Sequence, residues 1–308
     1  MVSSLISLVR GTLSLLLFVT ATLLISVPLI SLSLLKLVAY RSAYRSALTR
    51  WTDKVASAWI SGNNVHQRWL LPTRIAYEGP EHFSRRQWFM LVVNHQSWVD
   101  ILVLLRLFNR EVPYFKFFLK ASLIWIPVLG LAFWALDFPF MRRHTKAQIA
   151  RDPSLAGKDL ATTQKQCERY SNKPVTIISY LEGTRFTPAK HRAQSSPYRH
   201  LLLPKAGGLA FTLTAMNGRI KTLLDVTIHY PEGRPSFVQY IGGKVGQINV
   251  HARELEVGED LLGNYSEDEA FRAHFQGWIN RIWQEKDERL EALSHSGHAM
   301  PHKKSTDL

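Results

Sequence analysis

The 308-residue sequence has a single cysteine, Cys167, which excludes an intramolecular disulfide. It also lacks any group of cysteines and histidines with the spacing of a structural zinc site. No Gly-x-Ser-x-Gly motif occurs, and its absence weakens a serine hydrolase interpretation. These absences predict a domain that is kept in a reducing compartment and uses no disulfide. Apolar residues make up 46% of the chain, enough for one large globular domain or for a domain plus a membrane segment.

Acidic residues are scarce before His251: the first 250 residues contain 12 Asp/Glu and 31 Lys/Arg. From His251 onward there are 12 Asp/Glu and 7 Lys/Arg. Such a basic excess suits nucleic acid, an anionic bilayer surface or small anionic substrates. Zinc fingers and a basic helix with heptads are both missing, and the cations are interleaved with long apolar runs. We therefore expect anionic membrane lipids, and no nucleic acid, as partners.

Charge is absent altogether from Thr12 to Leu35. As a helix at ~1.5 Å per residue this segment would be about 36 Å long, so it predicts a transmembrane helix, kinked at Pro28. A cleaved signal peptide and a buried core helix are the alternatives. Five Lys/Arg lie between positions 36 and 54, and only Arg10 precedes the segment. By the positive-inside rule, the C-terminal side is expected in the cytoplasm.

A second apolar stretch runs from Ala121 to Met141 and contains Asp137 and two prolines. Basic residues flank it, and two tryptophans lie within it. This pattern favours an interfacial segment or the wall of an apolar tunnel over a membrane span. A buried helix fits the stretch equally well.

Short β-branched runs alternate with helical patterns in the rest of the chain. The expected strands are Phe89 to Val93, Val175 to Leu181, Leu223 to Tyr230, Phe237 to Ile241 and Gly246 to Val250. The expected helices are Trp98 to Phe108, Ala156 to Tyr170 and Glu267 to Leu293. This alternation predicts an α/β fold with a layered mixed sheet flanked by helices. The expected division is a membrane anchor with a basic segment (1–55), a catalytic domain (56–295) and a flexible tail (296–308).

His95 and Asp100 stand between two apolar runs, where an expected strand ends and an expected helix begins. Ser97 and Asp100 match a helix capping box, which gives the carboxylate a purely structural task. In the other interpretation the carboxylate orients His95 and favours its imidazolium, which strengthens the imidazole as a general base.

Two further clusters carry charge. Glu182, Gly183, Thr184 and Arg185 follow another expected strand, and the guanidinium could clamp a phosphate. An ordinary strand turn with solvated charges is the alternative. Arg142 and Arg143 follow the second apolar stretch, where they could equally be cations at a membrane edge.

The blocks NHQSWVD (94–100), FMRR (140–143) and EGTR (182–185), in this order, resemble the glycerol-phosphate and lysophospholipid acyltransferases that have a His-x4-Asp motif. The resemblance covers about residues 87 to 230. The extended run LEGTRFTPAKH (181–191) is similar to the branch that holds lysophosphatidate and lysocardiolipin acyltransferases, most closely the bacterial inner-membrane members. The last block of the family, a proline flanked by β-branched residues, is poorly matched, and no residue is assigned from it.

The resemblance implies a role for each matching position. His95 would be the general base that deprotonates an acceptor hydroxyl, and Asp100 its partner. Arg185 and Arg143 would contact the phosphate of the acceptor, and Glu182, Gly183 and Thr184 would shape the acceptor site. The implied donor is a thioester, acyl-CoA or acyl carrier protein, and the implied acceptor is lysophosphatidate or another lysophospholipid.

Acyl transfer from a thioester requires no metal, cofactor or covalent enzyme intermediate, because the thioester is already activated and a positioned base suffices. The cytosolic donor and the basic composition together predict a catalytic domain on the cytoplasmic side of a membrane. The resemblance implies that this membrane is the bacterial inner membrane. Two other functions remain open: a non-catalytic lipid-binding protein anchored in the membrane, and a hydrolase in which His95 activates water.

Overall fold

The computed structural model describes residues 2–39, 41–126, 129–141, 151, 158–170 and 173–295. The strands are β1 (Arg74–Glu78), β2 (Trp88–Val93), β3 (Phe115–Phe117), β4 (Leu119–Lys120), β5 (Phe140–Met141), β6 (Thr176–Tyr180), β7 (Ile220–His229) and β8 (Gln247–Glu256). The helices are α1 (Val2–Val38), α2 (Ser42–Leu70), α3 (Val99–Phe108), α4 (Leu129–Ala135), α6 (Lys158–Glu168), α7 (Pro188–Gln194), α8 (Gly207–Ala215), α9 (Phe237–Ile241) and α10 (Glu269–His295), with short 3₁₀ turns η1 (Ala121–Trp125) and η3 (Glu259–Leu261).

Within the described part of the chain, six strands form the main sheet in the order β1-β8-β7-β2-β6-β3. Neighbouring strands are parallel except β7 and β8, which are antiparallel. β2, with the sequence WFMLVV, lies in the interior of this sheet. A strand without polar residues is typical of a position covered on both faces. The expected fold class, a layered mixed α/β sheet flanked by helices, is confirmed.

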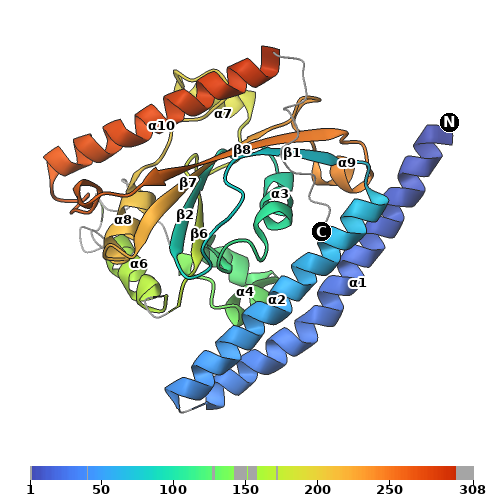
Figure 1. Cartoon of the computed structure of the whole chain (residues 1–308), viewed down its shortest axis with the longest axis horizontal. Helices are drawn as coiled ribbons and strands as arrows, with labels where there is room; N and C mark the ends of the chain where they lie inside the picture. The colour runs from blue at the N-terminus through green and yellow to red at the C-terminus, as the bar shows by residue number, and fades with distance from the viewer. Residues whose placement is uncertain are drawn as a thin grey trace.

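Each face of the sheet has its own apolar core, because successive side chains of a strand point to opposite faces. From β2, Phe89, Leu91 and Val93 pack against α3 and α9, whereas Met90 and Val92 pack against α6, α8 and α10. In Figure 1, α10 crosses one side of the sheet and α3 lies on the other. The helices therefore enclose the centre of the sheet on both faces.

Helices α1 and α2 form an antiparallel pair that lies along the domain (Figure 1). Near one end, the Ser7 hydroxyl donates to the Gly242 carbonyl, and a Cβ on Gly11 would lie 3.1 Å from the Gly242 Cα. Near the other end, the Lys36 ammonium donates to Asp137 over 2.7 Å and to the Ala135 carbonyl over 2.9 Å. The helix pair is thus docked on the domain over nearly its whole length.

A buried charge cluster joins α2 to the domain. Lys116 of β3 lies 3.5 Å from the Asp53 carboxylate of α2, and Lys173 also contacts that carboxylate. Burial lowers the pKa of Lys116, and the charge of Asp53 opposes this shift. A buried ion pair adds little net stability, but removing one partner leaves an uncompensated charge.

Most of the expected elements are present. Four of the five expected strands correspond to β2, β6, β7 and β8, and the three expected helices correspond to α3, α6 and α10. The expected strand Phe237 to Ile241 is wrong, because this segment is helix α9. A capping box starts this helix: the Ser236 side chain accepts from the Gln239 backbone N–H, and the Gln239 side chain accepts from the Ser236 backbone N–H. The sequence patterns do not predict β1, β3, β4, β5, α2, α7, α8 or α9, and α4 falls in the stretch for which a buried helix was one alternative.

The stretch from Ala121 to Met141 contains η1, the seven-residue helix α4 and β5, and residues 127–128 lie outside the described residues. Neither helical segment is long enough to cross a bilayer. Trp125 is 85% exposed, whereas Ala135 and Leu136 are buried against α1 and α2. The stretch therefore presents an apolar surface on one side and packs against the helix pair on the other.

The predicted boundary between residues 55 and 56 falls inside α2, and the predicted tail lies outside the described residues. The division of the chain into three segments stays a prediction.

Replacing Asp53 by alanine should lower the free energy of unfolding by about 3–5 kcal/mol, because Lys116 then remains buried without its carboxylate. Chemical denaturation in detergent measures the change. Asp260→Ala, which breaks the exposed pair with His274, is the matched control and should change little. Equal unfolding midpoints for the two variants would show that the buried cluster does not hold the helix pair.

Candidate active site

The two principal motifs meet because β2 and β6 are parallel neighbours that end at the same edge of the sheet. Val93, the last residue of β2, pairs with Tyr180, the last residue of β6. His95 and Glu182 each follow two residues later in the chain. In open α/β sheets, the carboxyl ends of parallel strands are where ligands usually bind.

His95 and Asp100 form a hydrogen-bonded pair, with 2.9 Å between Nδ1 and the carboxylate Oδ2. Because a carboxylate only accepts, Nδ1 carries the hydrogen and Nε2 presents its lone pair. The His95 ring also stacks on the Tyr180 ring, with 4.1 Å between the centroids. Among the described residues none hydrogen-bonds to Nε2, and the His95 side chain is 13% exposed. The imidazole is held on two sides, and one nitrogen is left for a substrate.

Asp100 is fully buried and accepts from four groups. Its Oδ2 accepts from His95 and from the backbone N–H of Gln96 (2.7 Å) and of Ser97 (2.9 Å), and its Oδ1 accepts from the Tyr230 hydroxyl (2.6 Å). Burial and the charge of Asp100 raise the pKa of Tyr230, so this phenol remains a donor. Only half of the expected capping box forms, because Ser97 Oγ accepts from Val99 rather than from Asp100. The carboxylate both caps the loop and orients the imidazole.

Glu182 is also fully buried, and each of its oxygens accepts one backbone N–H. Oε1 accepts from His95 over 2.6 Å, and Oε2 accepts from Leu202 over 3.0 Å. Burial raises the pKa of Glu182 to about 7, against the lowering effect of these two hydrogen bonds. Its carboxylate therefore joins the His95 loop to the segment around Leu202.

The rest of the EGTR turn forms the outer part of the site. Gly183 has a φ of +67°, a backbone conformation that favours glycine. The Thr184 hydroxyl accepts from the Lys190 ammonium over 2.7 Å. Arg185 is exposed and lies over the Trp98 ring, 4.6 Å from its centroid. Arg143, the other predicted phosphate contact, lies outside the described residues.

The C-terminal helix supports the site from behind. The Asp287 carboxylate of α10 accepts from the backbone N–H of Arg199 (2.7 Å) and of His200 (2.8 Å). The His200 carbonyl in turn accepts from the Gln96 side chain over 3.2 Å. α10 thus holds the segment from Arg199 to Leu202 in place. This segment in turn hydrogen-bonds to Glu182 and to Gln96, the residue after His95.

Several residues that contact the predicted ones were not predicted from the sequence. These are Tyr180, Tyr230, Gln96 and Lys190, and Arg234 and Asp287 support them from further out. Tyr180, Gln96 and Lys190 had a local signal, because each lies in or next to a quoted block. Tyr230, Arg234 and Asp287 depend on how a distant loop or helix returns to the sheet.

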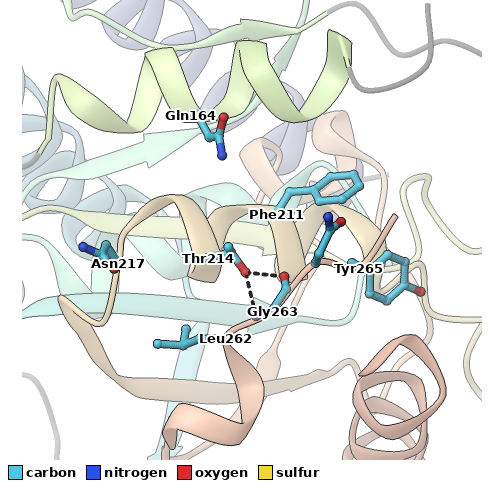
Figure 2. A pocket seen from close by; sticks show the side chains of 8 residues that line it. Gln164, Phe211, Thr214, Asn217, Leu262, Gly263 and Tyr265 are labelled. Carbon is cyan, nitrogen blue, oxygen red and sulfur yellow. Dashed lines mark hydrogen bonds between the residues drawn. The ribbon is translucent and has the colours of Figure 1, made fainter. Parts of the chain in front are cut away.

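A separate hollow of about 400 Å³ lies beside α6 and α8. Figure 2 shows Gln164, Phe211, Thr214 and Tyr265 around it, with the Thr214 hydroxyl bonded to the backbone of Gly263. None of the predicted site residues lines it.

Comparison with known proteins identifies the family. The family model described as Acyltransferase matches residues 74–234, just over half of the chain, and this range includes His95, Asp100 and the EGTR turn. The chain belongs to the acyltransferase family. The family inferred from the three sequence blocks is therefore confirmed.

Curated relatives share about a quarter of their residues with the chain. The 1-acyl-sn-glycerol-3-phosphate acyltransferase gamma of Mus musculus is 25% identical over 230 residues, which cover 70% of this chain and 56% of that protein. The 2-acyl-1-lysophosphatidylinositol acyltransferase of Saccharomyces cerevisiae is 26% identical over 253 residues, which cover 67% and 61%. The chain spans between about half and three fifths of the length of the curated relatives it matches.

Among solved structures, the crystal structure of the 1-acyl-sn-glycerophosphate acyltransferase of Thermotoga maritima aligns with a TM-score of 0.47 and 20% identity. The alignment covers 93% of this chain and 98% of that one.

Glu182→Gln should destabilise the protein by about 1–3 kcal/mol. Two backbone N–H groups each need an acceptor oxygen at this position, and an amide has only one, so one N–H would remain buried without a partner. It should also change the pH dependence of stability. The folded-state pKa of Glu182, about 7, lies above the unfolded value of 4.5, so the folded state binds more protons between these values. Stability should therefore fall as pH rises through this window.

Urea titrations of both proteins at pH 4.5, 6 and 8 measure this difference. The wild type should lose stability relative to Glu182→Gln between the first and last pH. Parallel curves for the two proteins would contradict the raised pKa.

Proposed function

We propose that the chain transfers a fatty acyl group from a thioester donor, acyl-CoA or acyl carrier protein, to the free hydroxyl of 1-acylglycerol 3-phosphate or a related lysophospholipid. The observation that carries this proposal is the His95–Asp100 pair, fixed beside the EGTR turn, in which no described residue hydrogen-bonds to Nε2 of the imidazole. Membership of the acyltransferase family and the substrates named in the curated relatives support it.

In the proposed reaction, His95 Nε2 takes the proton of the acceptor hydroxyl as that oxygen attacks the thioester carbonyl. The tetrahedral intermediate then collapses, the carbon–sulfur bond breaks, and the imidazolium returns the proton to the departing thiolate. Asp100 holds the imidazole in the required tautomer and stabilises the imidazolium. These steps use no metal or cofactor and no covalent enzyme intermediate.

Arg185 is the proposed phosphate contact of the acceptor. Its guanidinium lies on the Trp98 ring at the surface, where it can turn toward a phosphate that arrives from a membrane. Trp98 is 53% exposed. One face of its ring positions Arg185, and the rest of the ring can contact an acyl chain.

Membrane attachment through α1 belongs to the same proposal. In the described part of the chain, one helix, α1, is long and apolar enough to cross a membrane. Only 17% of its apolar stretch is buried inside the structure. Its outer face carries exposed Leu8, Leu24 and Val27. A signal sequence or a core helix can satisfy the same length and composition, so the attachment rests on this exposed apolar face.

The docked position of α1 favours attachment along the membrane over the span expected from sequence. From Ser7 to Lys36 the helix contacts the domain or α2, a length of about 43 Å at ~1.5 Å per residue. If α1 crossed the bilayer in this position, α2 with Arg45, Arg50 and Lys54 would enter the hydrocarbon layer beside it. We propose that the outer face of α1 lies in one leaflet. Attachment to the bacterial inner membrane stays a prediction.

His95→Ala should lower kcat for acyl transfer by at least ~10²-fold, because the general base is lost. Asp100→Asn should also lower kcat steeply while the fold survives. The amide oxygen can accept from Gln96 and Ser97, and Tyr230 can rotate to accept from the amide nitrogen, so only the charge is lost. His274→Ala is the matched surface control.

Thiol release from acyl-CoA, measured with and without lysophosphatidate, is the decisive assay. Release that requires lysophosphatidate supports acyl transfer. Release without it indicates a hydrolase, and no release in either case indicates a lipid-binding protein. A well-folded His95→Ala protein with wild-type transfer would exclude His95 as the base.

Cysteine labelling should distinguish the two membrane positions of α1. Arg10→Cys places a thiol in α1 just before its uncharged segment, and Arg192→Cys places one on the exposed surface of the domain. Native Cys167 gives little background, because it is buried and burial raises the pKa of its thiol to about 12. With protein added to preformed sealed vesicles, an impermeant maleimide should label both sites equally. Labelling of Arg10→Cys only after detergent is added would support a span.

A further inference from the structure

Arg234 lies in the loop between β7 and α9 and reaches back to the His95 loop. Its Nε donates to the Gln96 side chain, and its guanidinium lies over the Phe186 ring, 3.8 Å from the centroid. Gln96 follows His95 in the chain, and the Phe186 N–H donates to the His95 carbonyl over 2.8 Å. Both contacts of Arg234 therefore bring its charge close to the proposed base.

No carboxylate neutralises Arg234 at ion-pair distance within the described residues. Other arginines of the domain are paired, such as Arg253 with Asp225 and Glu285. Arg234 is exposed at the rim of the site; desolvation of its guanidinium by the surrounding residues lowers its pKa, while the charge of buried Glu182 opposes this effect. Desolvation of a cation that has no counter-charge is unfavourable, and a bound anion would offset it.

The hydrogen bond through Nε and the ring contact hold the guanidinium at one edge and on one face. Its terminal nitrogens, Nη1 and Nη2, have no acceptor among the described residues. Two parallel N–H groups on a planar guanidinium match two oxygens of a phosphate. Arg185 is exposed as well, but its guanidinium lies on the Trp98 ring instead.

We propose that Nη1 and Nη2 of Arg234 bind a phosphate of a substrate, as a second anion contact of the site besides Arg185. This inference rests on the proposed function. The phosphate is either the monoester of the lysolipid acceptor or the diphosphate of a CoA donor, since both present the same oxygens. Through Gln96, the bound phosphate would be coupled to the loop that carries His95.

Steady-state kinetics of Arg234→Met test this role and identify the source of the phosphate. Methionine keeps a long side chain on Phe186 but loses the charge and the donors. Two substrate pairs are compared: lysophosphatidate with monoacylglycerol, and acyl-CoA with acyl-pantetheine. The matched control is Arg219→Met, at the other end of β7, where the arginine donates to the Met216 carbonyl.

The KM of one phosphorylated substrate should rise by about 10- to 100-fold, the range for losing a hydrogen-bonded charge contact, and kcat should change less than about twofold. The KM of its phosphate-free analogue should stay unchanged. A rise for lysophosphatidate identifies the acceptor as the source, and a rise for acyl-CoA identifies the donor. Equal loss for all four substrates, or no change in any KM, would overturn the proposal.

Calorimetric titration with short-chain lysophosphatidate and with CoA separates this inference from the proposed function, because it needs no turnover. Arg234→Met should weaken the binding of one of them at least about tenfold, and His95→Ala should leave it unchanged. A wild-type chain that transfers no acyl group but shows this difference would refute the proposed function alone. Equal binding by wild type and Arg234→Met would refute the phosphate contact.

Discussion

The geometry of the candidate site depends on one buried carboxylate, that of Glu182. One oxygen accepts the His95 N–H, and the other accepts the Leu202 N–H, so two loops that share no secondary structure are held at a fixed separation. The segment of Leu202 is itself bonded to α10 through Trp283 and Asp287. A residue that sequence reasoning placed at the acceptor site therefore also links the base to the scaffold. Burying a carboxylate is costly, and these two hydrogen bonds offset part of that cost.

The residues around His95 could be predicted in part from the sequence, because the signal for each motif is local. A strand that ends before His95, and another that ends before Glu182, predict a common sheet edge once both strands are known to be parallel. The contacts of Tyr230 and Asp287 could not be predicted, since each depends on how a distant loop or helix returns to the sheet. The helix at residues 237–241 was misread because β-branched and aromatic residues suggested a strand, although Ser236 and Gln239 carry the signal of a capping box.

The N-terminal helix illustrates a different limit of sequence reasoning. Its length and lack of charge predict a membrane segment, but neither reveals whether the helix has a protein surface to lie on. That surface is formed by α2, α4 and the turn at Gly242, which are far apart in the sequence. Small residues at Ser7 and Gly11 permit the close approach at one end, and Lys36 provides a polar contact at the other. The same apolar helix is therefore a docking element on the domain, and its exposed outer face is the part left for the proposed membrane attachment.

The distribution of charge around His95 suits a reaction in which a proton moves while anionic substrates are bound. Asp100 and Glu182 are both buried beside the histidine, but only Asp100 contacts the imidazole. Glu182 faces backbone N–H groups, and its raised pKa means that it is partly protonated near neutral pH, which reduces repulsion between the two carboxyl groups. The cations lie on the outer side, with Arg185 on Trp98 and Arg234 on Phe186. The negative charge next to the imidazole is thus inside, and the positive charge that can attract phosphate is at the surface.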